Sequence, residues 1–441
     1  MNIKELYSFY LDHPAVTTDS RNCPEGSIFI ALKGASFDGN KFAGQALAKG
    51  CSLAVVDEKE YYVADGRHLL VDDCLTAYKE LAREHRRHFS IPVIGITGTN
   101  GKTTTKELVS AVLARRYHVM HTEGNYNNDV GVPKTLLRLS ADDDIAVVEM
   151  GASHPGDIDK LVRYVEPTCG LITNVGRAHL QGFGSFEGVK KTKGELYDYL
   201  SAHDGLLFLN AANADLSEMA AGRSFSRVIT YGQGTGSDYA VEGHVTECAP
   251  FLNFEWTFNG AEPAFRKTYT VNTHVIGAYN IDNMLAAITA GLHFDVPAED
   301  ICDALAAYEP TNSRSELVRT VSNTLIVDAY NANPSSMKAA IDNFNLMQAS
   351  GKMAILGDMR ELGPTSLEEH QNVVNLLTGY GINDVWLVGS EFMKTKTPDT
   401  FRKFGTVEDV KAEIAAHKPQ GRCILIKGSN GIRLFELPQL L

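Results

Sequence analysis

The sequence predicts an α/β protein of three domains, in which a central phosphate-binding domain stands between a small N-terminal α/β domain and a C-terminal α/β domain. The chain has 441 residues, which is more than one typical hydrophobic core organises. Apolar runs alternate with helical patterns from residue 91 to about residue 210, and again after residue 310. This alternation is typical of mostly parallel sheets covered by helices. We therefore expect domains at residues 1–88, 89–310 and 311–441.

The N-terminal domain is predicted from two short strand candidates, Ser27 to Leu32 and Ser52 to Val56. It ends in the polar, basic stretch AREHRRHFS at residues 82–90. A run of this kind before an apolar strand is typical of a connection. We interpret it as a linker to the central domain.

The central domain is predicted from five apolar runs separated by helical patterns: IPVIGITG, HVMHTEG, IAVVEMG, CGLITNVG and GLLFLNA. Ligands bind at the carboxyl ends of the strands in such sheets. Residues 238–276 differ, because alternating runs such as FLNFEWTF close on Asn259-Gly260, which is a hairpin signal. We expect an antiparallel extension of the same domain there, followed by a helix from about Asn280 to Leu292.

The C-terminal domain is predicted from four further strand-like runs: TLIVDAY, KMAILGD, VWLVGS and CILIKGS. Helical patterns separate these runs, so the alternation of strand and helix restarts after residue 310. We expect a third, Rossmann-like α/β domain.

Residues 95–105 read GITGTNGKTTT between an apolar strand candidate and a helical pattern, and this context predicts a phosphate-binding loop. A strand that turns into a helix through glycines directs backbone N–H groups and the positive end of the helix at one spot. Gly98 and Gly101 let the backbone approach a ligand closely. Lys102 can reach terminal phosphates, and the Thr103 hydroxyl can ligate Mg²⁺. The alternative is an ordinary glycine turn between a strand and a helix.

The composition argues against several classes of protein. The formal net charge of -13 argues against sequence-independent binding to nucleic acid, which needs a basic surface. Seven cysteines occur singly, so neither a disulfide framework nor a zinc site is indicated, and a reducing compartment is expected. No apolar run is long enough to span a bilayer, and the N-terminal segment lacks the apolar core of a signal peptide. We expect a cytoplasmic protein that neither binds nucleic acid nor inserts into a membrane.

Two polar residues of the central domain come at the ends of strand candidates, where the topology directs them toward a bound nucleotide. Glu149 ends IAVVE, and its carboxylate is a ligand that Mg²⁺ prefers. His179 lies just past a strand candidate in LITNVGRAHLQGFGS, where an imidazole can complete a second metal site. The alternative for His179 is a packed or solvated side chain.

Lys193 and the segment at residues 123–133 each have two interpretations. Lys193 lies in KKTKGEL beside Lys190 and Lys191, and three lysines of this kind are ordinarily a solvated helix face. Composition does not choose among the three. The segment EGNYNNDVGVP offers amides, so we expect a loop that either binds ligand or only makes a turn.

With these residues assembled, the sequence resembles the ATP-dependent Mur ligases over nearly the whole chain. The motifs that carry the resemblance follow in the family's order: GITGTNGKTT, VVEMGAS, TNVGRAHLQGFGS, KTKGEL, GAYNIDNMLAA, VDAYNANPSSM, LGDMRELG and IKGSNGIR. Within the family, DAYNANPSSM is similar to the branch that joins D-Ala-D-Ala to UDP-N-acetylmuramoyl-tripeptide. The resemblance implies an ATP-dependent amide ligase of peptidoglycan precursor synthesis that works through an acyl phosphate and yields the UDP-N-acetylmuramoyl-pentapeptide, ADP and phosphate. It also implies that these two substrates are the partners of a monomeric protein.

The resemblance further implies roles for particular residues. The catalytic residues would be Lys102, Glu149, His179, Lys193 and Arg314. The ATP-binding residues would be Gly98, Thr99, Asn100, Gly101, Lys102, Thr103, Thr104, Asn280, Asn283, Arg314, Asp328 and Asn331. Two Mg²⁺ ions would be held by Thr103, Glu149, His179 and Lys193, and Lys193 matches the lysine that ligases of this family often carbamylate. The substrate-binding residues would be Ser20, Arg21, Lys33, Asp38, Asn127 and Asn128.

Three positions depart from the expected patterns. Ile96 stands where a phosphate-binding loop usually has glycine. Tyr279 stands where the family usually has histidine before Asn280, and Asn40 where it usually has histidine after Asp38-Gly39. These departures do not change the predicted activity. Two alternatives stay open: another ligase of the superfamily, such as a folate-type glutamate ligase, and a non-catalytic module whose phosphate loop acts as a nucleotide-gated switch.

Overall fold

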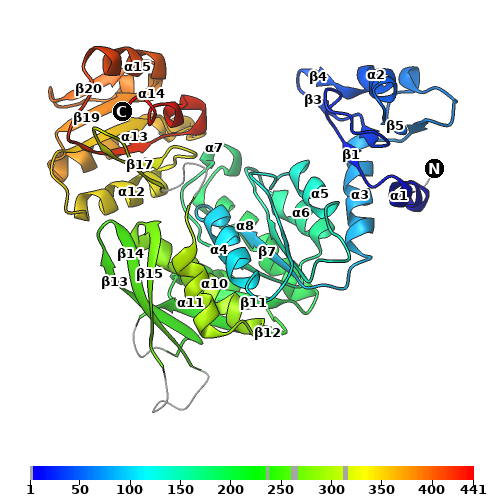
Figure 1. Ribbon diagram of the computed structural model, residues 1–441, viewed down its shortest axis with the longest axis horizontal. Coiled ribbons are helices and arrows are strands. Elements are labelled where there is room, and N and C mark those ends of the chain that lie inside the picture. Colours follow the sequence, from blue (N-terminus) through cyan, green and yellow to red (C-terminus); the bar gives the residue numbers. More distant parts are fainter. Residues whose placement is uncertain (1–2, 235–237, 260–266, 311–315) are drawn as a thin grey trace. The chain divides into compact units, whose positions relative to one another are not determined.

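The computed structural model describes residues 3–234, 238–259, 267–310 and 316–441 (Figure 1). The chain groups into two compact units. The first contains Met1–Gly95, Tyr117–Gly151 and Ile158–Cys169, and the second contains Ile96–Arg116, Ala152–Asp157 and Gly170–Leu441. Across the described ranges, no helix is both long enough and apolar enough to cross a membrane.

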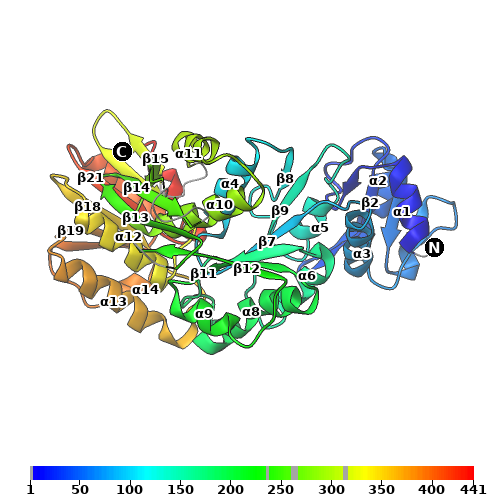
Figure 2. The ribbon, with the colours of Figure 1, turned by 90° about the horizontal axis from the view of Figure 1, so that it is seen from below.

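A four-stranded parallel sheet forms the N-terminal part, in the order β1-β2-β5-β6. Its strands are β1 (Val16–Thr17), β2 (Ile28–Ile30), β5 (Leu53–Val56) and β6 (His68–Leu70), and a short hairpin of β3 (Lys33–Gly34) and β4 (Phe37–Asp38) follows β2. The helices α1 (Ile3–Asp12), α2 (Ala43–Ala48) and α3 (Cys74–Arg86) lie around this sheet (Figure 2). Every residue of β2 and β5 is buried, as continuous apolar runs require. Both predicted strands are confirmed.

The stretch AREHRRHFS is helical in its first part, because α3 continues into it as far as Arg86. Helical spacing places Arg83 and Arg87 on one face, and both guanidinium groups bond to the Glu166 carboxylate, at 3.0 and 2.6 Å. Arg86 is only 6% exposed and donates to backbone oxygens of neighbouring segments. A basic helix end that bonds to another segment thus has the same composition as a solvated connection, and the linker between the two domains stays a prediction.

A nine-stranded sheet forms the central part, in the order β15-β14-β13-β12-β11-β10-β7-β9-β8. Its strands are β7 (Val93–Thr97), β8 (Val119–His121), β9 (Ile145–Glu149), β10 (Cys169–Ile172), β11 (Leu206–Asn210), β12 (Arg227–Gln233), β13 (Val241–Cys248), β14 (Phe251–Phe258) and β15 (Tyr269–Ile276). The pairs β8–β9, β11–β12 and β12–β13 are parallel, whereas β13–β14 and β14–β15 are antiparallel. The five predicted runs and the antiparallel extension are confirmed. Gly260 of the predicted turn lies outside the described residues.

Helices connect these strands and support the candidate site. They are α4 (Lys102–Leu113), α5 (Gly131–Leu136), α6 (Asp157–Val165), α7 (Leu180–Phe183), α8 (Phe186–Ala202), α9 (Ala214–Ala220), α10 (Ile281–His293) and α11 (Ala298–Ala307). The predicted helix at residues 280–292 is confirmed as α10, which packs against α4. Its sequence IDNMLAAITAGLH is apolar on nearly every side, which is typical of a helix buried between neighbours.

A six-stranded sheet forms the C-terminal part, in the order β16-β17-β21-β18-β19-β20. Its elements are β16 (Glu316–Arg319), β17 (Thr324–Asp328), α12 (Pro334–Leu346), β18 (Lys352–Gly357), α13 (Ser366–Gly379), β19 (Asp384–Val388), α14 (Ser390–Met393), β20 (Phe401–Phe404), α15 (Val407–Ala416) and β21 (Cys423–Lys427). All strands except β16 pair in parallel. Ala354 and Leu356 pack with α12 and α13, whereas Met353 and Ile355 of the same strand pack with α15. The helices therefore cover opposite faces of the sheet (Figure 1), which confirms the predicted Rossmann-like domain.

Candidate functional site

The predicted phosphate-binding loop joins β7 to α4. Gly101 precedes α4 with a φ of 76°, and Gly98 has a φ of 148°, a region that favours glycine. A Cβ on Gly98 would lie 1.9 Å from Thr173 Oγ1. The Thr173 hydroxyl donates to Asn100 O at 2.6 Å, and the side-chain oxygen of Asn174 accepts from the Asn100 N–H at 3.0 Å. The segment after β10 therefore fixes the shape of the loop.

We expect Gly98→Ala to destabilise the protein by about 3 kcal/mol, because the added methyl group meets Thr173 Oγ1 and the residue must keep a positive φ. Gly44→Ala is the matched control, since Gly44 lies in α2 with nothing within 4 Å of an added Cβ. Alanine in a helix is favoured over glycine by about 1 kcal/mol. The midpoints of urea unfolding should therefore shift in opposite directions. An unchanged midpoint for Gly98→Ala would contradict the packing around this loop.

Lys102 and Thr103 begin α4. Lys102 Nζ donates to the backbone oxygens of Gly98 and Thr99, at 2.9 and 3.1 Å, so the ammonium group lies over the loop. Thr103 is 4% exposed, and Thr104 follows on the same turn. A cation and hydroxyl groups at the start of a helix are the groups that bind a phosphate and its metal ion.

The imidazole of His179 lies within electrostatic reach of Lys102 and Lys193. Burial lowers the pKa of His179, the Glu361 carboxylate opposes that shift, and the two lysine charges add to it. The imidazole is therefore neutral at neutral pH, which is the form that binds a metal ion. The structure thus brings together three residues that the sequence predicted for one site.

The structure distinguishes the lysines of KKTKGEL. Lys193 is 2% exposed, and its Nζ donates to Ala152 O at 3.5 Å. Lys190, on the same helix α8, forms ion pairs with Asp215 and Glu218 at 2.7 and 2.8 Å. The interpretation as a solvated face therefore holds for Lys191, which is exposed, and not for Lys193.

Glu149 ends β9 and is 1% exposed. Asn127 Nδ2 donates to Glu149 Oε1 at 2.7 Å, so one of the predicted substrate-binding residues orients the predicted metal ligand. Asn128 Oδ1 accepts from the backbone N–H groups of Val130 and Gly131. The segment at residues 123–133 is thus only partly a loop, because α5 begins at Gly131, whose N–H bonds to the Asn128 side chain.

The donor set suits a hard divalent cation. Mg²⁺ prefers oxygen ligands, and in the second unit the Thr103 hydroxyl offers one, to which the neutral imidazole of His179 adds a nitrogen. The Glu149 carboxylate, in the first unit, is an oxygen ligand of the same kind. In the part of the chain that the structure describes, no three His, Cys, Asp or Glu side chains group as a metal site by themselves. Thr103 and His179 therefore fit a cation that takes its remaining ligands from elsewhere, such as the phosphate oxygens of a nucleotide, and a metal site shared with Glu149 stays a prediction.

Asn280 and Asn283, predicted to bind ATP, are buried and hydrogen-bonded within the protein. Asn280 Nδ2 donates to Ile276 O, and Asn283 Nδ2 donates to Asn280 Oδ1, both at 2.8 Å. Asn283 Oδ1 accepts from the Thr105 hydroxyl at 3.0 Å and so connects α10 to the helix of the phosphate-binding loop. Their contact with a nucleotide stays a prediction.

Asp328 and Asn331, the predicted nucleotide contacts of the C-terminal part, lie at and just after the end of β17. Lys427 is 1% exposed, and its Nζ bonds to the Asp328 carboxylate and to Asn331 O. A buried ion pair of this kind fixes the carboxyl ends of β17 and β21 against each other. The predicted residues are therefore held in place by a lysine of the IKGSNGIR motif.

Three of the predicted substrate-binding residues, Ser20, Arg21 and Lys33, lie near the carboxyl ends of β1 and β2. Ser20 is buried, whereas the Arg21 side chain is 87% exposed and forms an ion pair with Asp19 at 2.9 Å. Lys33 Nζ forms an ion pair with Asp57 at 2.9 Å. These cations are available near the surface for an anionic ligand, and their contact with it stays a prediction.

Asn40 is fully buried, and its amide explains one departure from the family pattern. Asn40 Nδ2 donates to Asp38 Oδ1 and Asp57 Oδ1, at 3.0 and 2.8 Å, and Asn40 Oδ1 accepts from the Asp57 N–H at 3.0 Å. An imidazole cannot replace this amide. One amide nitrogen donates two hydrogen bonds here while the amide oxygen accepts one, and an imidazole nitrogen can donate only one. Asn40 therefore organises the two carboxylates around it.

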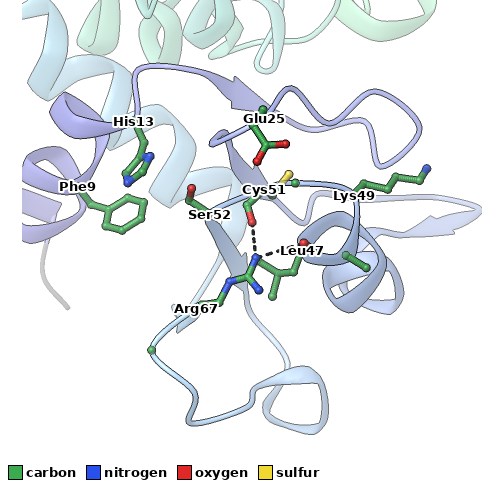
Figure 3. Close-up of a pocket in the computed structure, with 11 residues that line it drawn as sticks. Phe9, His13, Glu25, Leu47, Lys49, Cys51, Ser52 and Arg67 are labelled. Carbon is green, nitrogen blue, oxygen red and sulfur yellow. Dashed lines mark hydrogen bonds between the residues drawn. The ribbon is translucent and has the colours of Figure 1, made fainter.

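A cavity of about 700 Å³ lies at the other end of the N-terminal sheet (Figure 3). Its lining includes Glu25, Ser52 and Arg67, which precede β2, β5 and β6, so it lies at the amino ends of parallel strands. The Arg67 guanidinium donates to the backbone oxygens of Leu47 and Cys51, at 3.2 and 2.7 Å (Figure 3). Because ligands of such sheets bind at the carboxyl ends, we do not assign this cavity to the predicted site.

Two contacts of the site could not be found from the sequence. Asn333 Nδ2 donates to Asn100 Oδ1 at 2.7 Å, and the Glu361 carboxylate bonds to His179 Nδ1. Both residues lie in the family motifs, but 233 and 182 residues separate them from their partners. Only the fold brings them together. Arg314, the predicted phosphate contact from the C-terminal part, lies outside the described residues.

Family models match three consecutive parts of the chain. The model described as the Mur ligase family catalytic domain matches residues 14–86. The Mur ligase middle domain matches residues 96–291, and the Mur ligase glutamate ligase domain matches residues 313–430.

Curated relatives match the chain over nearly its full length. A Bacillus subtilis protein is 34% identical over 99% of this chain and 96% of its own length. An Escherichia coli protein is 33% identical over 99% of this chain and 95% of its own. Both are named UDP-N-acetylmuramoyl-tripeptide–D-alanyl-D-alanine ligase.

Solved structures show the same similarity. MurF from Thermotoga maritima in complex with ADP has a TM-score of 0.84 at 25% identity, over 97% of this chain and 96% of that one. MurF from Acinetobacter baumannii has a TM-score of 0.83 at 30% identity, over 96% of this chain and 92% of that one. A folylpolyglutamate synthase from Mycobacterium tuberculosis, 15% identical with a TM-score of 0.62, shares the fold alone.

Proposed function

Because the chain belongs to the Mur ligase family, we propose that it is the ATP-dependent ligase that joins D-Ala-D-Ala to UDP-N-acetylmuramoyl-tripeptide. The products are UDP-N-acetylmuramoyl-pentapeptide, a precursor of peptidoglycan, together with ADP and phosphate. The full-length relatives that carry this name support the choice of substrates. The observation that supports the chemistry is the grouping of Lys102 and Lys193 around the neutral imidazole of His179.

The first step activates a carboxylate. A free carboxylate is a poor acyl donor, so the terminal carboxylate of the tripeptide attacks the γ-phosphorus of ATP. The bond from that phosphorus to the ADP oxygen breaks, and an acyl phosphate forms. Lys102 stabilises the charge on the phosphoryl group that is transferred. Its ammonium group gives up its hydrogen bonds to the backbone oxygens of Gly98 and Thr99 and bonds to phosphate oxygens instead.

The second step forms the amide. The neutral amine of D-Ala-D-Ala attacks the acyl carbon, the C–N bond forms, phosphate leaves, and the nitrogen loses a proton. Holding both substrates beside ATP turns encounters between separate molecules into positioned steps. The ligase therefore releases phosphate only when the acceptor amine is present.

Two Mg²⁺ ions would supply positive charge to the phosphoryl groups, with Thr103, Glu149, His179 and a carbamylated Lys193 as their ligands. A carbamate converts the lysine cation into a carboxylate-like oxygen ligand, which suits Mg²⁺. Arg314 would contact the phosphates from the C-terminal domain.

We also propose where the remaining contacts lie. Domains at residues 1–88, 89–310 and 311–441 would hold the nucleotide-sugar, ATP and the acceptor. ATP would be bound by Gly98, Thr99, Asn100, Gly101, Thr104, Asn280, Asn283, Asp328 and Asn331. The nucleotide-sugar peptide would be bound by Ser20, Arg21, Lys33, Asp38, Asn127 and Asn128. The protein would act as a monomer in the cytoplasm.

Phosphate release from ATP tests this function. We expect steady turnover only when UDP-N-acetylmuramoyl-tripeptide and D-Ala-D-Ala are both present, with formation of the pentapeptide checked by mass spectrometry. Turnover with the nucleotide-sugar peptide alone would contradict the proposal. Turnover with folate and glutamate in their place would favour a folate-type ligase. Nucleotide binding without turnover on either substrate set would favour a nucleotide-gated module.

A further inference from the structure

Glu361 and His179 meet side chain to side chain in an uncommon backbone geometry. The Glu361 carboxylate bonds to His179 Nδ1, and the Gln181 N–H donates to Glu361 O at 3.3 Å. His179 has a φ of 51° and Glu361 a φ of 63°, so both are non-glycine residues in the left-handed region. Such residues are uncommon and cluster where surrounding structure fixes a functional geometry. Here two of them lie opposite each other.

The segment that carries Glu361 is anchored in the core of the C-terminal part. Met359 and Leu362 on either side of it are buried in the cluster that contains α12 and α13. The Asp358 carboxylate accepts from the Glu391 and Phe392 N–H groups, both at 2.9 Å, and so holds the start of α14. The Glu361 carboxylate therefore projects from a rigid support and does not depend on a free loop.

We propose that Glu361 is a positioning residue for the metal-binding imidazole of His179. A bond at Nδ1 leaves Nε2 as the nitrogen that can bind a metal ion, fixes the ring in one tautomer, and makes Nε2 a stronger donor. Carboxylates commonly serve metal-binding histidines in this way. This inference rests on the proposed function, because His179 is a metal ligand only there. Its consequence is that a residue of LGDMRELG in the C-terminal part sets the metal affinity of the phosphate site.

Binding of Mn²⁺ tests the inference without an assay of turnover. The free-Mn²⁺ signal in electron paramagnetic resonance gives the affinity of the protein for Mn²⁺ in the presence of ADP. We expect Glu361→Ala to weaken Mn²⁺ binding by about 10-fold, and Glu361→Gln by less, because a neutral amide oxygen can still accept from Nδ1. Glu361 is exposed, so both variants should fold with the melting temperature of the parent.

Glu369→Gln is the matched control. Glu369 pairs with Arg177 at 3.8 Å in the same region, and it is not the carboxylate that we propose for His179. It should leave Mn²⁺ affinity unchanged. In the double variant with His179→Ala, Glu361→Ala should cause no further loss, because its effect passes through the imidazole. If Glu361→Ala bound Mn²⁺ as tightly as the parent or more tightly, while His179→Ala bound it more weakly, the inference about Glu361 would be overturned and the proposed function would stand. Unchanged binding by His179→Ala would instead overturn the metal site of the proposed function.

Discussion

Lys193→Ala is expected to reduce ATP-dependent phosphate release by about 100-fold or more, because in the proposed mechanism Lys193 stabilises the charge of the transferring phosphoryl group, either directly or through a metal ion. Lys193 is 2% exposed and acts on His179, which places it inside the site. Lys190→Ala is the control on the same helix. Lys190 pairs with the exposed carboxylates of Asp215 and Glu218 and is not one of the predicted site residues, so turnover should stay close to that of the parent.

The Lys193→Ala variant also distinguishes two chemical forms of the residue. If Lys193 acts as a carbamate, formate or acetate should restore part of the turnover, and methylamine should not. Rescue by methylamine and not by the acids would show that the ammonium form acts. Thermal unfolding of the variant serves as the control for folding, because a buried side chain has been removed. Turnover at the level of Lys190→Ala would exclude Lys193 from the reaction.

Much of the fold could be predicted because its strands are short apolar runs with clear ends. IAVVE and CGLI became β9 and β10, and the glycine-rich loop formed between β7 and α4 as expected. The structure of the stretch AREHRRHFS could not be predicted from a local pattern of this kind. Its arginines bond to Glu166, which lies 83 residues from Arg83, and no local pattern contains that contact.

The site could be predicted as a set of residue types, but not as a set of partners. Lys191 and Lys193 have the same local composition, but the tertiary fold leaves Lys191 exposed and buries Lys193. Asn40 differs from the expected histidine because two carboxylates surround it, and one of these belongs to a later strand end. Glu361 stands 182 residues from His179, so its role depends on how the chain folds. Sequence motifs therefore named the candidate residues, and the structure supplied the contacts that surround them.

Lys102→Ala is expected to lower kcat for phosphate release by about 1,000-fold, while ADP affinity falls much less. The lysine acts on charge that develops at the γ-phosphoryl group, and ADP lacks that group. Removal of the ammonium leaves the oxygens of Gly98 and Thr99 to bond with water, so the loop itself should stay folded. Stopped assays of phosphate release give kcat, and calorimetric titrations with ADP and a non-hydrolysable ATP analogue give the two affinities.

Two further variants show whether the charge or its geometry matters. Lys102→Arg should not restore turnover, because a planar guanidinium does not occupy the place of a compact ammonium over the loop. Lys338→Ala is the control for loss of a surface cation, since Lys338 is an exposed residue of α12 that pairs with Asp342 four residues later. A kcat for Lys102→Ala within about tenfold of the parent would mean that charge stabilisation at the γ-phosphate comes from other groups. Equal losses of ADP and ATP-analogue affinity, with kcat unchanged, would mean that the lysine only holds the nucleotide and does not act on the transition state.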